Sequence, residues 1–158
     1  MLSIGDKVPS FALPDAGMEM VCLDDYLGRR NVVLYFYLKD GTPGCLRQAI
    51  DFTDLEDQFE KVDAIVFGVS CDDVLAHASF RDEHGLSVRL LSDAEGDVCR
   101  LFGVLEERAL NGITKIMVNR STFIIDKQGR VCHVFRGVNP KGHAQEVLRL
   151  LRETSKPH

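Results

Sequence analysis

Hydrophobic residues form two kinds of pattern along the chain. Residues 32–37 and 63–70 are almost wholly apolar and rich in β-formers, which predicts two strands buried on both faces. Residues 88–91 form a shorter apolar run and are interpreted as a third strand. Between the first two runs, over residues 46–62, apolar side chains recur at close to a helical period. The chain therefore begins as an alternation of strands and helices.

Turn and capping residues divide the rest of the chain. The elements they delimit are an irregular layer with a short hairpin at 8–28, a helix at 73–85, a helix that starts at Ser92-Asp93, a strand hairpin at 121–135 and a closing helix at about 141–152. Residues 106–119 have mixed polarity around Asn111-Gly112 and are interpreted as a loop, with one short strand as the alternative. This order of elements predicts an α/β protein, a three-layer α/β/α sandwich around a central mixed sheet, as one domain over residues 1–158.

Composition and charge narrow the classes of function. The chain has 158 residues, 45% of them hydrophobic, and a formal net charge of -5. That charge argues against nucleic acid or an anionic membrane as the main partner. The longest apolar run is too short to span a bilayer, and the N-terminus lacks the pattern of a signal peptide. We therefore expect a cytoplasmic bacterial protein that binds neither nucleic acid nor membrane.

Cys45 stands at the junction between the first buried run and the helical pattern. A turn at Asp40-Gly41 and then Pro43, a residue common in the first turn of a helix, place this cysteine at or near a helix N-terminus. Unpaired N–H groups and the positive end of the helix dipole favour an anion there. Because the thiolate is the reactive form of cysteine, the position predicts a nucleophile. A buried structural thiol is the competing interpretation.

The other cysteines and the histidines form no second motif. Five cysteines occur without a CxxC pair, so their spacing predicts neither a zinc ribbon nor a thioredoxin-type dithiol. The histidines lack a metal-ligand spacing, and we expect no metal site and no cofactor. Cys22 and Cys132 are interpreted as packing residues. Cys71, in contrast, follows a buried strand whose C-terminal end is expected to border the reactive site.

The turn Thr42-Pro43-Gly44-Cys45 also carries a resemblance to a known family. The chain resembles the peroxiredoxins over nearly its whole length, in particular the bacterioferritin-comigratory-protein or PrxQ subfamily of the AhpC/TSA-like proteins. The matching segments are 5–15, 36–40, 42–45, 69–72, 91–93, 102–104 and 120–126. The resemblance implies a thioredoxin-like fold with an N-terminal β-hairpin extension.

The resemblance further implies a thiol peroxidase that reduces hydrogen peroxide and alkyl hydroperoxides. Cys45 would be the peroxidatic cysteine, Thr42 would hydrogen-bond the peroxide and Arg120 would face the thiolate. Pro43 and Gly44 would complete the shell around the sulfur. The chemistry agrees, because displacing an alkoxide from a peroxide oxygen needs a thiolate together with donors for the negative charge that spreads over both oxygens.

Three positions depart from the family pattern. The proline of PxxxTxxC is Leu38 here, and the acidic residue usual three positions after the cysteine is Gln48. Many members of the subfamily carry a resolving cysteine five residues after the first, where this chain has Ile50, and the alternative place within 74–80 also holds no cysteine. The usual intramolecular disulfide of the subfamily therefore cannot form.

Two routes remain open for recycling oxidised Cys45. In the favoured route an external thioredoxin- or glutathione-like thiol attacks the sulfenic acid directly; in the other, Cys71 or Cys99 resolves it after local unwinding. We expect a monomer or weak homodimer. The changes at Leu38 and Gln48 also motivate a non-enzymatic alternative, a degenerate family member that senses redox state or binds a partner. A disulfide reductase is a third hypothesis, disfavoured by the absence of CxxC.

Overall fold

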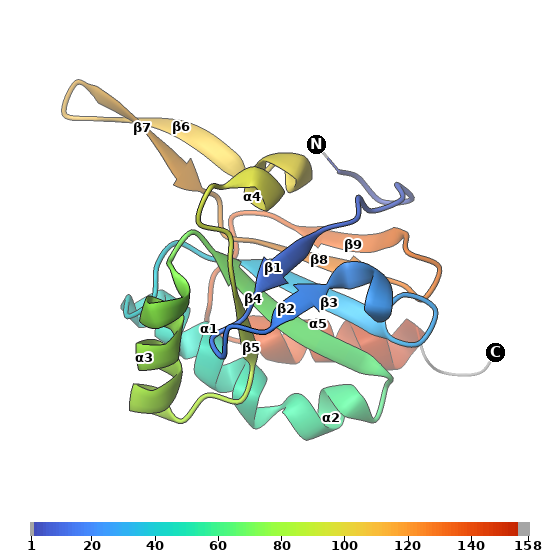
Figure 1. Cartoon of the computed structure of the whole chain (residues 1–158). Coiled ribbons are helices and arrows are strands. Elements are labelled where there is room, and N and C mark those ends of the chain that lie inside the picture. The colour runs from blue at the N-terminus through green and yellow to red at the C-terminus, as the bar shows by residue number, and fades with distance from the viewer. Residues whose placement is uncertain (1, 155–158) are drawn as a thin grey trace.

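A five-stranded mixed sheet lies at the centre of the protein, whose computed structural model describes residues 2–154 (Figure 1). The strand order is β5-β4-β3-β8-β9, with β3, β4 and β5 parallel and with β8 antiparallel to both β3 and β9. The strands are β3 (Asn31–Phe36), β4 (Ala64–Ser70), β5 (Arg89–Ser92), β8 (Ser121–Ile125) and β9 (Val131–Phe135). The predicted buried strands are thus confirmed, and β3 is the middle one.

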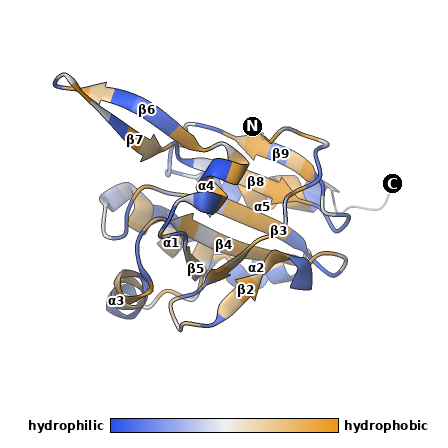
Figure 2. Ribbon diagram, turned by 45° about the horizontal axis from the view of Figure 1, so that its top comes forward, coloured by the Kyte–Doolittle hydropathy of each residue, from blue (hydrophilic) through white to orange (hydrophobic). Residues whose placement is uncertain are grey.

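The apolar run of β3 supplies both faces of the sheet. Successive side chains of a strand point to opposite faces, so Val32, Leu34 and Phe36 belong to one hydrophobic cluster. Val33 and Tyr35 belong to the cluster on the opposite face. All five side chains are fully buried, and Figure 2 shows hydrophobic residues concentrated along the central strands.

Helices cover the face of the sheet to which Tyr35 points. Phe52, Phe59 and Leu148 pack there, from α1, α2 and α5 respectively, and α3 adds Phe80. These helices are α1 (Pro43–Asp54), α2 (Glu56–Glu60), α3 (Val74–His84) and α5 (His143–Thr154). None of the helices within residues 2–154 has the length and apolar content needed to cross a membrane.

The opposite face is covered by an N-terminal layer and one short helix. Leu13, Val21 and Phe102 pack against this side of the sheet. These residues belong to β1 (Ala12–Pro14), β2 (Met20–Cys22) and α4 (Asp97–Phe102), and the 3₁₀ turn Leu23–Asp25 adds Leu23. The two coverings confirm the predicted three layers and the N-terminal hairpin.

Two predicted helices have different limits in the structure. The helical pattern of 46–62 is interrupted at Leu55, which separates α1 from α2. The helix predicted to start at Ser92-Asp93 begins instead at Asp97. The Asp93 carboxylate nevertheless serves that helix, because it accepts hydrogen bonds from the backbone N–H groups of Val98 and Cys99 at 3.2 and 2.8 Å. Asp93 was therefore identified correctly as a capping residue, but it caps a helix that begins four residues later, at Asp97.

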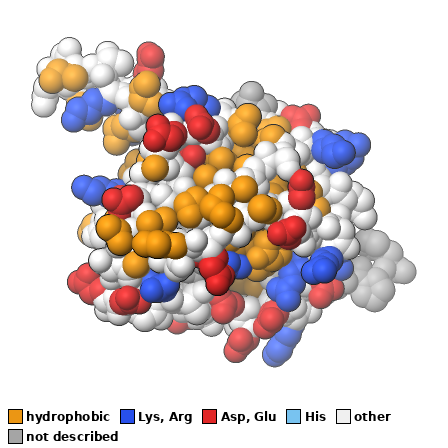
Figure 3. Space-filling model, viewed as in Figure 1, with side chains coloured by type: hydrophobic (Ala, Val, Ile, Leu, Met, Phe, Trp, Pro, Cys, Tyr) orange, Lys and Arg blue, Asp and Glu red, His pale blue; other side chains and the backbone are white. Residues whose placement is uncertain are grey.

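The interpretation of residues 106–119 as a loop is wrong. They lie in an antiparallel hairpin, β6 (Leu105–Leu110) and β7 (Ile113–Val118). Asn111 and Gly112 both have positive φ values, 52° and 78°, as a two-residue type I′ turn requires. The hairpin projects from the body of the molecule (Figures 1 and 3), and most of its residues are exposed, so no alternating pattern marks its strands in the sequence.

Candidate active site

Cys45 lies in the first turn of α1, as predicted. The helix starts at Pro43, and the N–H of Leu46 donates to the carbonyl of Thr42 at 2.9 Å, the first hydrogen bond of the helix. The Cys45 side chain is only 1% exposed and packs in the cluster that contains Tyr35. The sulfur is therefore shielded from bulk water at the positive end of a twelve-residue helix.

Arg120 follows Cys45 by 75 residues in the sequence but contacts it in the folded protein. Its Nη2 donates a hydrogen bond to the Cys45 sulfur at 3.4 Å. The sheet register explains the meeting, because Ser121, the first residue of β8, pairs with Phe36, the last residue of β3. Arg120, the residue before Ser121, therefore lies beside the end of β3, where the turn that carries Cys45 begins. The contact puts a positive charge beside the sulfur, and the planar guanidinium keeps further donors available for a bound oxygen.

The absence of a side chain at Gly44 leaves space for the guanidinium of Arg120. A Cβ atom at this position would lie 3.0 and 3.1 Å from Nη2 and Nη1 of Arg120, and 3.1 Å from Cγ of Pro140. Any side chain here would press on the group that contacts the sulfur. The glycine of the turn is explained by this close approach.

Thr42 is the N-cap residue of α1, but its hydroxyl does not cap the helix. The hydroxyl donates instead to the carbonyl of Lys39 at 3.0 Å. Its oxygen keeps lone pairs that could accept a proton donor such as the O–H of a hydroperoxide. Thr42 is thus placed on the same turn as Cys45, with its own proton engaged.

Tyr35 is a neighbour of the sulfur that sequence reasoning did not identify. Burial, and then the charge of Cys45, raise the pKa of its phenol well above the usual range. Its hydroxyl has no hydrogen-bond partner within residues 2–154. Gly68 on β4 makes space for the ring, since a Cβ there would lie 2.6 Å from Tyr35 Cζ. In the sequence, Tyr35 is only one apolar residue of a buried strand, and no local signal sets it apart.

The two substituted family positions occupy different surroundings. Gln48, one helical turn after Cys45, is 1% exposed, and its amide nitrogen and oxygen find no partner in the described part of the chain. Leu38 is 39% exposed. It lines an open groove together with Lys39, Cys71 and Ile116. Leucine at this position therefore borders the surface next to the turn.

The remaining cysteines have different surroundings, and Cys132 packs against the cluster that contains Cys45. Cys99 is fully buried in the cluster on the opposite face of the sheet from Cys45. Cys71 is exposed at the end of β4. Cys132 is half-buried, its thiol lies 3.3 Å from the carbonyl of Ile124, and burial raises its pKa to about 11. Cys22 is half-buried on the N-terminal hairpin.

A buried polar network lies beside the turn, and sequence reasoning also missed it. Nδ1 of fully buried His77 lies 2.6 Å from the Asp40 carboxylate, and its Nε2 donates to the carbonyl of Leu91 at 3.0 Å. Tyr37 donates to the same carboxylate at 2.6 Å. Asp72 accepts from the backbone N–H of Asp40 at 2.9 Å. Asp40, Asp72 and His77 are close enough to suggest metal ligands, but these hydrogen bonds account for their closeness.

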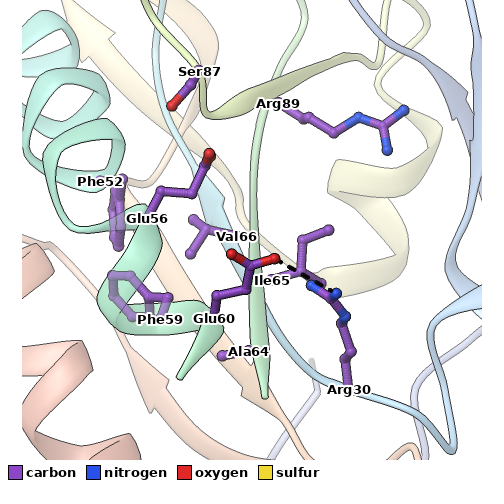
Figure 4. A pocket seen from close by; sticks show the side chains of 10 residues that line it. All are labelled: Arg30, Phe52, Glu56, Phe59, Glu60, Ala64, Ile65, Val66, Ser87 and Arg89. Carbon is purple, nitrogen blue, oxygen red and sulfur yellow. Dashed lines mark ion pairs between the residues drawn. The ribbon is translucent and has the colours of Figure 1, made fainter. Parts of the chain in front are cut away.

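A separate pocket lies beside α2 and β4, away from the cysteine turn (Figure 4). Its walls include Phe52 and Phe59, and Arg30 and Glu60 form an ion pair across 3.9 Å. Neither Cys45 nor Arg120 lines it. No cysteine occurs among the residues that line this pocket.

Comparison with known proteins agrees with this geometry. The sequence model of the AhpC/TSA family matches residues 4–134. The chain belongs to the AhpC/TSA family. Peroxiredoxin Bcp of Bacillus subtilis is 40% identical over 154 residues, which cover 98% of each chain. Peroxiredoxin Bcp of Escherichia coli is 39% identical over 152 residues, 96% of this chain and 97% of the relative. The resemblance to the bacterioferritin-comigratory-protein or PrxQ peroxiredoxins is thereby confirmed.

Solved structures of this subfamily confirm the fold. A PrxQ mutant of Xylella fastidiosa superposes with a TM-score of 0.93 at 36% identity, over 99% of both chains. The bacterioferritin comigratory protein of Xanthomonas campestris gives a TM-score of 0.90 at 33% identity, over 96% of this chain and all of the other. That structure concerns the alkyl peroxide reduction activity of the Xanthomonas protein. The predicted thioredoxin-like architecture is correct.

Proposed function

We propose that this peroxiredoxin is a thiol peroxidase for hydrogen peroxide and alkyl hydroperoxides, with Cys45 as the peroxidatic cysteine. The contact between Arg120 Nη2 and Cys45 Sγ, at the start of α1, carries the proposal. It places a positive charge and the positive end of the helix dipole beside one sulfur. The subfamily membership and the alkyl peroxide reduction described for the Xanthomonas relative support the same substrate class.

In the proposed reaction, the Cys45 thiolate attacks one peroxide oxygen. An S–O bond forms, the O–O bond breaks, and the leaving alkoxide takes a proton to become an alcohol. Arg120 and the N–H groups of the first turn of α1 face the charge that develops on the oxygens. Thr42 accepts the peroxide O–H and so orients the substrate. The product on the enzyme is the sulfenic acid of Cys45.

An external thiol then restores Cys45. Position 50 is isoleucine, Cys99 lies in the cluster on the other face of the sheet, and Cys71 lies against Cys99, so neither Cys71 nor Cys99 is placed beside Cys45 for direct resolution. A thioredoxin-like or small thiol attacks the sulfenic acid, water leaves, and a second thiol frees Cys45 from the mixed disulfide. We further propose that the protein works in the cytoplasm of a bacterium as a monomer or weak homodimer, which sedimentation at micromolar concentrations tests.

The decisive experiment is stopped-flow consumption of hydrogen peroxide by Cys45→Ser. Serine keeps the size and polarity of the side chain but supplies no thiolate, so we expect the fast reaction to disappear. Cys22→Ser is the matched control, because Cys22 is half-buried on the N-terminal hairpin and should react like the wild type. Near-normal consumption by Cys45→Ser would contradict the proposed mechanism.

A further inference from the structure

Cys71 and Cys99 lie against each other at one end of the sheet. Their sulfur atoms and a carboxylate oxygen of Asp93 are all within 4.8 Å of one another. Cys71 follows β4, Asp93 follows β5, and the parallel register places Ser70 opposite Ser92. The N–H of Asp93 donates to the carbonyl of Ser70 at 2.8 Å. The closeness of the two thiols therefore results from the strand pairing.

The two thiols differ in exposure and in acidity. Cys71 is exposed in the groove that Leu38 also lines, whereas Cys99 is fully buried. Hydrogen bonding from Cys99 lowers the pKa of Cys71, against burial and the charges of Asp93 and Asp72. The same interaction with Cys71, together with burial and Asp93, raises the pKa of Cys99. Cys71 is consequently the thiol that ionises and meets solutes, and Cys99 is the thiol that keeps its proton.

We propose that Cys71 and Cys99 form a second redox centre, a reversible disulfide that hydroperoxide produces without the participation of Cys45. The two sulfur atoms lie within 4.8 Å of each other, and they must approach to about 2.05 Å to form an S–S bond. The exposed partner meets the oxidant and the buried partner resolves it.

The reaction proceeds in two steps. The Cys71 thiolate attacks a peroxide oxygen, an S–O bond forms, the O–O bond breaks, and the alkoxide leaves as alcohol after taking a proton. The Cys99 thiol then attacks the Cys71 sulfur, an S–S bond forms and the S–O bond breaks. The proton of Cys99 passes by way of Asp93 to the departing hydroxide, which leaves as water. Two thiols lose two electrons, and one hydroperoxide gains them.

A metal site is the less favourable use of the same three side chains. Two thiolates and a carboxylate are a possible ligand set for a soft divalent cation. Both oxygens of Asp93 already accept backbone hydrogen bonds, however, from Val98 and Cys99. A ligating Asp93 would have to give up part of the N-terminal capping of α4. The dithiol needs no such loss.

The redox pair uses the oxidant class of the proposed function but none of the chemistry of Cys45. Cys45 and Cys99 lie in clusters on opposite faces of the sheet, and Cys71 lacks an arginine contact like that of Cys45 with Arg120 among the hydrogen bonds of residues 2–154. We therefore expect Cys45 to be oxidised first and the pair to be oxidised when hydroperoxide is in excess. The two proposals can fail separately.

The test is performed on full-length Cys45→Ser, in which all four other cysteines remain. The protein is dialysed against a chelator, treated with excess hydrogen peroxide and digested for disulfide mapping by mass spectrometry. We expect the loss of two free thiols and one cross-linked peptide that joins Cys71 to Cys99. A dithiol reductant should return both thiols.

Matched variants in the Cys45→Ser background identify the pair. Adding Cys71→Ser, at an exposed position, should prevent the loss of two thiols, whereas adding Cys22→Ser should leave it unchanged. The proposal is overturned if both thiols stay free in excess peroxide, or if Cys71 reaches the sulfinic acid while Cys99 remains a thiol. A bridge in Cys45→Ser alongside a wild type that consumes peroxide no faster than Cys45→Ser would contradict the proposed function and leave the redox pair standing.

Discussion

The planar guanidinium of Arg120 is the group proposed to assist the chemistry of Cys45. One of its nitrogens contacts the sulfur at 3.4 Å, and its Nε is buried without a partner in the described part of the chain. It therefore has donors left for a peroxide oxygen beside the thiolate. A lysine would supply the charge from a single point and could not hold sulfur and oxygen at fixed positions together.

Arg120→Lys should consequently be far from conservative. We expect the second-order rate with hydrogen peroxide to fall roughly 100-fold, as when a positioned donor to a developing charge is removed. Alkylation of Cys45 by iodoacetamide should slow as well, because the sulfur loses the guanidinium that contacts it. Arg130→Lys, on the exposed turn before β9, serves as the control. Unchanged peroxide and alkylation rates in Arg120→Lys would remove this residue from the site.

Among the residues of the site, sequence reasoning found those with a local signature. Cys45 and Thr42 are marked by the turn that starts a helix, and Arg120 by the resemblance. Tyr35 and His77 carry no such mark, because their importance arises from partners distant in the sequence, Cys45 for Tyr35 and Asp40 for His77. Buried polar contacts of this kind depend on the packing of whole elements, which a single sequence does not specify.

At the scale of elements, the polar network of His77 joins three segments. The residue lies on α3, and its two ring nitrogens reach Asp40 in the turn before α1 and the carbonyl of Leu91 on β5. Asp40 is two residues before Thr42. The network therefore holds the turn that carries the reactive cysteine against a helix and a strand, and a positioning role follows for His77.

His77→Gln should loosen this connection. Glutamine can replace one of the two hydrogen bonds but not both, so we expect the free energy of unfolding to fall by about 1.5–3 kcal/mol, the range for a bond to a charged group. Amide hydrogen exchange over residues 38–46 should also accelerate. The control is His84→Gln, an exposed position on the same helix. Unchanged exchange in the turn would show that the network stabilises only α3 and β5.

The elements themselves were predicted to different degrees, for physical reasons. Strands β3 and β4 are buried on both faces and consist of long apolar runs, so their positions could be predicted directly from the sequence. The hairpin β6–β7 is exposed along most of its length, and its strands leave no apolar face in the sequence. Its one usable signal was Asn111-Gly112, a dipeptide typical of two-residue hairpin turns. The interpretation of residues 106–119 as a loop did not use this dipeptide as a hairpin turn.

At the scale of the whole molecule, His143 links stability to pH. Its Nε2 lies 2.8 Å from the hydroxyl of Thr122, and burial lowers its pKa from 6.5 to about 4. The folded protein keeps this ring neutral, whereas the unfolded chain takes up a proton near pH 6.5. Between these two values the unfolded state binds more protons, so the free energy of unfolding decreases as the pH falls from 6.5 to 4.

The wild type should lose roughly 3 kcal/mol through this residue across that window, at 1.36 kcal/mol per pKa unit. Urea unfolding at a series of pH values measures the loss. His143→Gln can still hydrogen-bond Thr122 but cannot titrate, so the difference between the two proteins isolates the histidine from the carboxylates. His133→Gln, on half-buried β9, is the control. Parallel pH profiles for wild type and His143→Gln would contradict the assignment.

The fate of oxidised Cys45 depends on where the whole fold puts its cysteines. Cys45 is on the face of the sheet covered by α1, Cys99 is on the other face, and Cys71 lies against Cys99. One equivalent of hydrogen peroxide without reductant should therefore leave a sulfenic acid on Cys45 that dimedone traps, with no disulfide that includes Cys45. Added small thiol should restore it, and Cys71→Ser/Cys99→Ser should turn over at the wild-type rate with the same thiol. A quantitative Cys45–Cys71 or Cys45–Cys99 bridge in the mass map would instead require α1 to unwind and an internal thiol to complete the cycle.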